Sequence, residues 1–337
     1  MKRWQFWVGI LISLIFLYFS MRNLRLGEVW EAMKTAHYWV LIPGVAVYFV
    51  AVWARAWRWH YMLRPLKAIP TKEMFPVVTI GYMGNNIFPY RAGEVLRAFV
   101  LRRRENVPVS ASLATIIVER VFDGVVMLAF VFINLPELTR LTAEKSTGLS
   151  HINIQGLAIG GTAAFLGALG VFLLAAMFPY RTEKVANWFI QHLLPSRLRE
   201  KASELTTRFL GGLESLRSPR DVLMIFLTSA VIWLLETAKY YIVALGFDIN
   251  VSFFALMLMN GIANLLTTLP SAPGYIGTFD AAGIAVLSAY GVEPSLAAGY
   301  TLVLHGALWL PITALGAYYF LKREGLQWGK VPQEEVS

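Results

Sequence analysis

The sequence contains no cysteine, and this absence removes several kinds of chemistry at once. Disulfides, thiolate metal sites and a cysteine nucleophile are all excluded. Only five histidines occur in 337 residues, and they lack the spacing of a zinc site, so we expect neither a metal nor another cofactor. No Walker motif is present either, which excludes the common phosphate-binding loop of ATP-driven transporters.

Charged residues are also scarce, at 15% of the chain against about 25% in soluble globular proteins. Hydrophobic residues make up 57%, and apolar runs of about 20 residues recur along the sequence. This pattern predicts an all-α, polytopic membrane helical bundle in which residues 1–337 form a single integral membrane domain. The net charge of +9 is explained by cytoplasmic Lys and Arg, so no nucleic-acid partner is expected.

Six apolar runs are long enough to predict full membrane spans. The first follows Lys2 and Arg3 and lacks the small-residue exit site of a cleaved signal peptide, so we interpret it as an uncleaved span. The six runs are Trp4–Phe19, Tyr38–Trp57, Val109–Leu135, Gln155–Phe178, Val222–Leu245 and Pro294–Leu321. Two interrupted apolar regions, 74–101 and 252–290, remain between them.

The distribution of Lys and Arg predicts which ends of the spans face the cytoplasm. If the N-terminus lies inside, the inside segments hold 22 Lys and Arg residues and the outside segments hold 5. The inside segments are 1–3, 55–72, 97–104, 179–220 and 322–337. This bias predicts a multi-pass protein of the cell membrane with both termini in the cytoplasm.

The longest cytoplasmic segment, 179–220, is predicted to hold two amphipathic helices. Val185, Trp188, Phe189 and His192 share one helical face, which is typical of a helix that lies in the membrane interface. A second apolar face follows at Leu198, Ala202, Leu205, Phe209 and Leu216. We interpret 179–220 as a cytoplasmic insertion that shields the inner ends of the bundle.

Both interrupted regions combine apolar helix with residues that break helices. In the first region the interruption consists of Asn85, Asn86, Pro89, Arg91, Gly93 and Glu94, of which Pro89 and Gly93 are the predicted hinge residues. In the second, the hinge residues are Pro270, Pro273, Gly274 and Gly277, followed by Asp280. The first region is too short for two spans, so a re-entrant hairpin is predicted there. The second is long enough that two short spans remain an alternative.

The two interrupted regions resemble each other and enter the membrane from opposite sides. Each contains Asn-rich apolar sequence, then Pro-x-x-x-Gly and then an acidic residue, at Asn86–Glu94 and at Asn264–Asp280. This is typical of an inverted repeat, which places a substrate site between paired broken helices near the midplane. Chance similarity remains an alternative, because few positions match. We predict that the tips of the two hairpins approach each other.

Several charged residues lie at membrane depth, where each costs roughly 2.5–3.5 kcal/mol unless it has a partner. Glu119 and Asp123 share a helix face next to Arg120, and Glu236 and Lys239 are spaced to pair. We predict ion pairs or the lining of a polar cavity. The candidates for gating or ion pairing are Glu94, Glu119, Asp123, Glu236, Lys239, Asp280 and His305. Arg91, just before the second half-helix, is a candidate phosphate ligand, although neutralisation of Glu94, Glu119 or Asp123 would also explain it.

These motifs together resemble a known family. The motif from Gly81 to Arg97, the Glu119-Arg120-x-x-Asp123 motif and the motif from Pro270 to Asp280 are similar to the flippase-like family, also called the lysylphosphatidylglycerol synthase transmembrane region. The resemblance covers nearly the whole chain and implies a lipid-handling role for these motifs. It departs from the family at Asp280 and His305, and the soluble aminoacyl-transferase domain is not found after the last span.

The resemblance and the residues together predict a flippase that moves a phosphate-bearing lipid, either a phospholipid or a polyprenyl-phosphate-linked headgroup, between leaflets. The predicted substrate-binding residues are Asn85, Asn86, Arg91, Arg97 and Arg120. We expect a membrane lipid as substrate and no enzymatic activity. The alternatives are a membrane-embedded lipid-phosphate transferase and a scaffold for a separate lipid-modifying synthase, which would then be a partner.

Overall fold

The computed structural model describes residues 3–22, 24–136, 178–268 and 271–325, together with isolated positions between 160 and 177. Every element in these ranges is helical, which agrees with the predicted all-α membrane protein. Most of the predicted span Gln155–Phe178 and the predicted hinge residue Pro270 lie outside the described residues.

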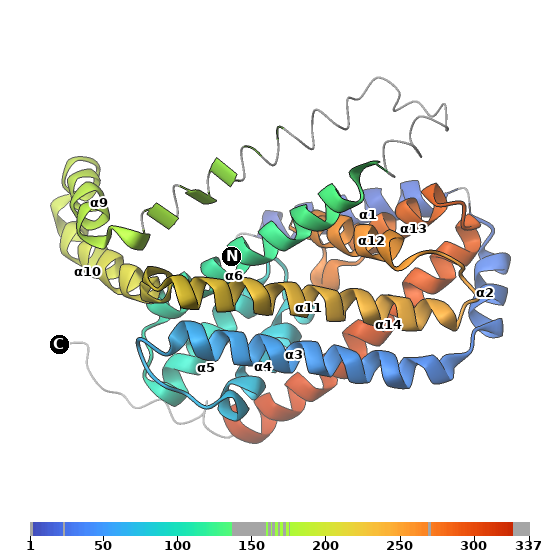
Figure 1. Ribbon diagram of the computed structural model, residues 1–337, viewed down its shortest axis with the longest axis horizontal. Helices are drawn as coiled ribbons and strands as arrows, with labels where there is room; N and C mark the ends of the chain where they lie inside the picture. The colour runs from blue at the N-terminus through green and yellow to red at the C-terminus, as the bar shows by residue number, and fades with distance from the viewer. Residues whose placement is uncertain are drawn as a thin grey trace.

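Helices α3 (Leu41–Leu63) and α11 (Pro219–Leu245) run nearly along the longest axis of the molecule, and α14 (Pro294–Tyr319) crosses the view obliquely (Figure 1). Helix α3 follows the short η1 (Tyr38–Val40), and it lies beside α11. Helix α14 continues into η4 (Phe320–Gly325). Within the described residues, these three segments are long and apolar enough to cross a membrane, and a bent pair near the N-terminus makes up to four.

Two further helices complete the comparison with the predicted spans. Helix α1 (Arg3–Met21) precedes the short α2 (Leu26–Thr35), and the two are the bent pair. Helix α6 (Val109–Ile133) has 25 residues, but three charged residues lie in its middle and lower its hydropathy. The predicted total of six spans therefore stays a prediction.

The amphipathic segment forms α9 (Pro179–Leu193), α10 (Ser196–Gly212) and η2 (Glu214–Arg217). In Figure 1 these helices lie at one end of the bundle and α2 lies at the other, as the predicted sidedness requires. Helix α10 packs against α6, whereas Val185, Trp188 and Phe189 on α9 are exposed. This apolar exposed face fits the predicted position of α9 at a membrane surface.

Both interrupted regions fold as pairs of short helices. The first is α4 (Thr71–Ile87) and α5 (Ala92–Glu105), and the second is α12 (Phe253–Leu266) and α13 (Thr278–Ala289), with the short η3 (Pro273–Tyr275) between them. The four helices have 12 to 17 residues, fewer than the roughly 20 of a full span. Tyr90 and Arg91 take left-handed backbone conformations, with φ of 58° and 52°, which reverse the chain between α4 and α5.

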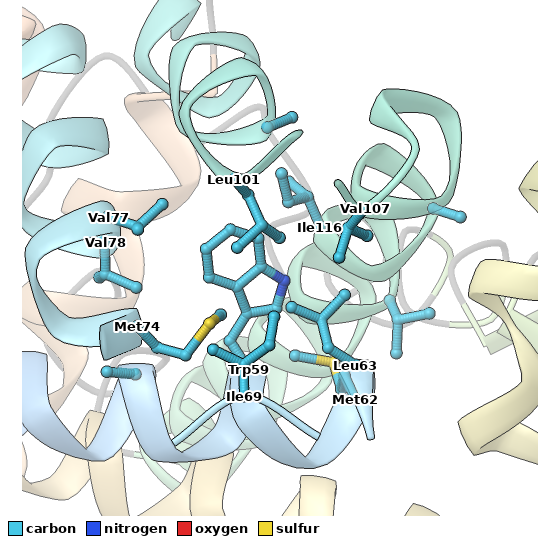
Figure 2. Close-up of a cluster of buried hydrophobic side chains, with 14 of the residues drawn as sticks. Trp59, Met62, Leu63, Ile69, Met74, Val77, Val78, Leu101, Val107 and Ile116 are labelled. Carbon is cyan, nitrogen blue, oxygen red and sulfur yellow. The ribbon is translucent and has the colours of Figure 1, made fainter. Parts of the chain in front are cut away.

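A buried cluster around Trp59 fixes α3 against the first hairpin and α6 (Figure 2). Its members include Met62, Met74, Leu101 and Ile116, which come from four different helices. The Trp59 indole Nε1 donates a hydrogen bond of 2.9 Å to Thr115 Oγ1 on α6. Because consecutive helical residues point about 100° apart, fixing Trp59 also fixes the direction of the preceding residue, Arg58.

The assignment of 55–72 to a cytoplasmic segment was wrong at its start. Helix α3 continues to Leu63, so Arg55 and Arg58 lie within the bundle and are buried. Arg97, counted in the cytoplasmic segment 97–104, is buried as well. Removing these three from the 22 inside residues leaves 19 against 5, so the predicted orientation does not depend on them. Apolar length alone could not reveal that the helix continues, because charged residues interrupt the run.

Candidate functional site

An ion-pair cluster between α3, α5 and α6 lies at the centre of the bundle. Arg58 donates from Nη2 to Glu119 at 2.8 Å and from Nη1 to Asp123 at 2.6 Å. Arg97 Nη2 binds the other oxygen of Glu119 at 2.6 Å. The four side chains are at most 5% exposed, and two guanidinium groups match two carboxylates. We call these four residues the inner cluster; it is electrically neutral.

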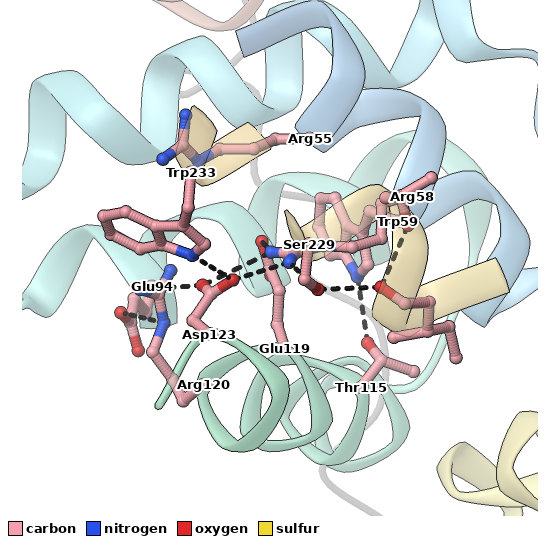
Figure 3. A network of polar contacts seen from close by, with 12 residues as sticks. Arg55, Arg58, Trp59, Glu94, Thr115, Glu119, Arg120, Asp123, Ser229 and Trp233 are labelled. Carbon is pink, nitrogen blue, oxygen red and sulfur yellow. Dashed lines mark hydrogen bonds and ion pairs between the residues drawn. The ribbon is translucent and has the colours of Figure 1, made fainter. Parts of the chain in front are cut away.

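Further hydrogen bonds connect the inner cluster to α11 (Figure 3). Ser229 Oγ accepts from Arg58 at 2.6 Å, and Trp233 Nε1 donates to Asp123 at 2.9 Å. Buried ionic groups are tolerated only when paired and hydrogen-bonded, and these contacts meet that condition. The inner cluster therefore joins α3, α5, α6 and α11 at one point.

Arg120 and Arg91 share a second carboxylate, Glu94. Arg120 Nε lies 3.1 Å from Glu94, and its Nη1 lies 3.5 Å from Asp123, so Arg120 has the partners that the sequence predicted. Arg91 Nη1 lies 3.6 Å from Glu94. These cations are more exposed than those of the inner cluster, at 33% for Arg120 and 24% for Arg91.

Arg91 also connects the two hairpins. Its Nη2 lies 3.3 Å from Thr267 Oγ1, and its guanidinium lies 5.7 Å from the ring centroid of Tyr275. Thr267 and Tyr275 belong to the turn between α12 and α13. The prediction that the hairpin tips approach each other is therefore confirmed, while their re-entrant character stays a prediction.

A third group of charges connects α3 with α11. Glu236 accepts a 2.5 Å contact from Arg55 and is also paired with Lys239, at the predicted spacing of three residues. The Lys239 ammonium lies 4.0 Å from the ring centroid of Tyr48, a cation–π distance. Here two cations share one carboxylate, so this group of three side chains carries one excess positive charge.

Helix α14 holds both tips through residues on one face. His305 binds the Gly274 carbonyl and the Asp280 carboxylate, each at 2.8 Å. Asn86 donates to Thr313 Oγ1 at 2.8 Å. Positions 305, 309 and 313 recur every four residues, so His305, Trp309 and Thr313 form a stripe along α14.

A polar cavity lies between these groups. About 130 Å³ of it is open to water-sized molecules, enough for about four waters at about 30 Å³ each. Its lining comprises Tyr48, Arg55, Tyr82, Asn85, Asn86, Arg91, Glu94, Arg120, Trp233, Glu236, Lys239, Tyr240, Asn264, Thr267, Gly274, Tyr275, Phe279, His305, Leu308 and Trp309. Among these described residues, four Lys or Arg side chains face two carboxylates, which leaves two positive charges apart from the His305–Asp280 pair. The cavity therefore favours an anion.

A second pocket adjoins the cavity and shares Asn85, Arg91, Thr267 and Tyr275 with it. The predicted hinge residue Pro89 lines this second pocket. Phe88 and Tyr90 line it too, and they are 49% and 41% exposed at the molecular surface. The contact between the tips thus separates the central cavity from an opening with an apolar rim.

The predicted site residues divide between the cavity and the layer behind it. Asn85, Asn86, Arg91 and Arg120 line the cavity, whereas Arg97 belongs to the inner cluster and is not among the lining residues. Of the predicted pairing residues, Glu94, Glu236, Lys239 and His305 line the cavity, while Glu119, Asp123 and Asp280 support them from behind. Gly93 packs between the helices of the first hairpin, and Gly277 is the N-cap of α13.

Sequence reasoning missed Arg55, Arg58, Tyr275 and Trp309. Two arginines three residues apart within an aromatic-rich segment were a usable signal, because both fall on one face if the helix continues. Tyr275 and Trp309 gave no such signal, since aromatic residues are common in apolar membrane segments.

Comparison with known proteins identifies the chain's relatives. The model of the lysylphosphatidylglycerol synthase transmembrane region matches residues 6–316, nearly the whole chain. The chain belongs to this family. It is 29% identical over 307 residues to a protein of Haloferax volcanii named glycosyltransferase AglD, and this match covers 82% of the chain but only 47% of AglD.

Other relatives match over nearly their full length. Two UPF0104 membrane proteins of Methanothermobacter thermautotrophicus are 24% and 25% identical, covering 86% and 95% of the chain and 87% and 93% of theirs. No solved structure matches. The chain is thus a membrane protein similar to stand-alone members of the family.

Proposed function

We propose that the protein moves an anionic, phosphate-bearing lipid between the two leaflets, with the headgroup in the central cavity and the acyl chains in the bilayer. The observation that carries this proposal is the excess of two positive charges on a cavity enclosed by broken helices. Uncompensated buried charge costs several kcal/mol, so an anionic occupant is favoured. A lipid phosphate supplies that charge.

The position of the cavity supports a lipid over a free anion. The adjoining pocket opens between exposed apolar side chains at the hairpin tips, so acyl chains have an apolar path outside while the phosphate lies inside. Room for about four waters suits a phosphate with at most a small attached group. In this conformation a large oligosaccharide headgroup does not fit.

The residues take distinct roles in this proposal. Arg91 and Arg120 bind the phosphate, because both line the cavity and share Glu94, the one carboxylate near them among the described lining residues. Asn85 and Asn86 offer amide groups to the headgroup, and the buried Asn85 Oδ1 has no hydrogen-bond partner among the residues that the structure describes. Arg97, Glu119 and Asp123 position Arg120 and the α3–α6 contact from behind the cavity.

Replacing Arg91 with Ala tests the proposal. We expect lipid movement to be lost, because charge-assisted contacts to phosphate are the strong ones. Arg91→Lys should restore it in part, since Lys keeps the charge but loses the planar fork. The measurement is a leaflet-specific assay of fluorescent anionic and zwitterionic phospholipids in proteoliposomes, with thermal melting of each variant as a control for folding. Normal transport by a stable Arg91→Ala protein would contradict the proposal.

The name of AglD supports a second candidate, a transferase that acts on a lipid phosphate. Because this chain spans about half of AglD, the activity in that name is not tied to the matched part. The two candidates differ in their products: a transferase forms a new covalent lipid when pure protein is supplied with donor and acceptor, and a transporter only redistributes the lipid. A scaffold would be favoured if the pure protein neither forms a new lipid nor redistributes one, and if removing the protein from cells abolishes the activity of a partner synthase.

A further inference from the structure

The protons around His305 are determined by its partners. Its Nε2 lies 2.8 Å from the Gly274 carbonyl oxygen, which can only accept, so Nε2 must carry a hydrogen. Its Nδ1 lies 2.8 Å from Asp280 Oδ1. A hydrogen bond at this distance needs a second proton between the two atoms. The geometry therefore requires one proton more than a neutral imidazole and a carboxylate carry together.

Asp280 has no alternative arrangement that removes this requirement. Its Oδ2 already accepts a hydrogen bond of 2.9 Å from the Gly277 backbone N–H. The side chains of Asp280 and His305 are 3% and 14% exposed, so water replaces a lost bond poorly. When the shared proton leaves, the neutral imidazole keeps a hydrogen on one nitrogen only and must give up either Asp280 or Gly274. The charge-assisted bond to Asp280 is the stronger of the two, so the Gly274 bond is the one lost.

Gly274 lies in the η3 turn that closes the cavity from the side of the second hairpin. The turn holds Gly274 and Tyr275 in left-handed conformations, with φ of 71° and 63°. Tyr275 faces Arg91 of the first hairpin, and the His305 bond fixes the carbonyl of the residue before it. A turn with such backbone strain needs surrounding contacts to persist.

We propose that Asp280 and His305 form a proton-binding site that latches the η3 turn, so that loss of the proton releases the turn and separates the hairpin tips. The latch is a property of this chain whether or not lipid moves. Its use to couple a proton gradient to transport rests on the proposed function.

Other ionisable groups also line the cavity, so the pH response must be assigned by substitution. From the surrounding helices they are Tyr48 and Arg55, Tyr82, Arg91 and Glu94, Arg120, Glu236, Lys239 and Tyr240, with Tyr275 on the turn. A pH-dependent transition that requires both Asp280 and His305 identifies the latch.

The absence of native cysteine allows a direct test, because one introduced thiol is the only one present. Ser271→Cys places a thiol of nearly the same size at a position 5% exposed beside the turn. Thr268→Cys, at an exposed position, serves as the reference for the general rise of thiol reactivity with pH, and substitutions of Asp280 and His305 separate the latch from the ionisation of the buried thiol itself. The reaction of purified full-length protein with a small maleimide is followed from about pH 5 to about pH 9, which brackets histidine titration.

We expect the ratio of the Ser271→Cys rate to the Thr268→Cys rate to rise with pH in one step of about 2- to 10-fold, the effect of one hydrogen bond. In Asp280→Asn the ratio of the two reaction rates should stay low at every pH, because the new amide nitrogen donates to His305 Nδ1 while the amide oxygen still accepts from the Gly277 backbone N–H. In His305→Ala the ratio should stay high at every pH, because the hydrogen bond to the Gly274 carbonyl is lost. His192→Gln, which removes an exposed histidine on α9, should titrate as the unchanged protein does.

A ratio that does not change with pH would overturn the latch, as would an unchanged titration in Asp280→Asn. A titration lost in His192→Gln would overturn it too. The lipid assay answers a separate question: if the thiol ratio titrates as expected and no lipid moves, the latch stands and the transport proposal fails. If lipid moves and the ratio is constant, the transport proposal stands and the latch fails.

Discussion

Arg58 illustrates how one residue connects the fold to the site. Its side chain is fully buried, and it binds Glu119, Asp123 and Ser229 at once. Such a residue is costly to desolvate and is stable only with all its partners in place. At the residue scale, the inner cluster therefore supports the fold. Its loss would also affect the cavity, because Asp123 of the cluster pairs with Arg120, which lines the cavity.

Removing Arg58 should destabilise the protein strongly. Arg58→Ala leaves two buried carboxylates with fewer partners, so we expect a loss of about 3–5 kcal/mol in unfolding free energy. Arg25→Ala is the matched control, because its pair with Glu28 is exposed to solvent and contributes little to stability. Denaturant titration in detergent micelles compares the two. Equal, small losses would show that the inner cluster does not support the fold.

The first hairpin depends on close contact between α4 and α5. A Cβ added to Gly93 would lie 1.9 Å from the Gly81 carbonyl oxygen and 2.4 Å from the Asn85 backbone nitrogen. Both are backbone atoms and cannot rotate away. Only glycine at 93 allows this approach, which keeps Arg91 and Glu94 beside the turn of the second hairpin.

At this scale we predict that Gly93→Ala separates the two helices. The variant should lose lipid movement and melt at a clearly lower temperature, because backbone clashes force α5 away from α4. Gly306→Ala is the control: nothing lies within 4 Å of its added Cβ, and alanine favours a helix interior by about 1 kcal/mol. Melting curves of both proteins decide the matter. A Gly93→Ala protein as stable as the Gly306→Ala protein would refute the close-packing argument.

The whole molecule has two ends of different character. The short α2 lies at one end, and the basic helices α9 and α10 lie at the other (Figure 1). The excess of Lys and Arg on one set of segments predicts that the α9–α10 end faces the cytoplasm.

Thiol labelling in intact cells tests this orientation. Glu31→Cys on α2 should react with a membrane-impermeant maleimide added outside, because Glu31 is exposed and α2 lies at the end predicted to face outward. Lys201→Cys on α10, also exposed, should react only after the membrane is permeabilised. The unchanged chain has no cysteine and sets the background. The reverse labelling pattern would require an inverted topology.

The sequence by itself determined the membrane class, the helical fold, the two broken regions and most of the charged residues of the site. It could do so because apolar length, helix-breaking residues and charge at membrane depth are local features with large energetic consequences. The spacing of Glu119 and Asp123 correctly placed both on one helix face. The family motifs added the lipid-handling interpretation.

Only the tertiary structure decided which charges meet. Arg58 lies 61 residues from Glu119 along the chain and 171 from Ser229, and no periodicity relates them. Likewise, the division into a neutral inner cluster and a positive cavity depends on helix packing, because each cation had several carboxylates within possible reach. Sequence fixes the charges that must be paired in an apolar bundle, and packing selects the partners and leaves the remaining charge facing the cavity.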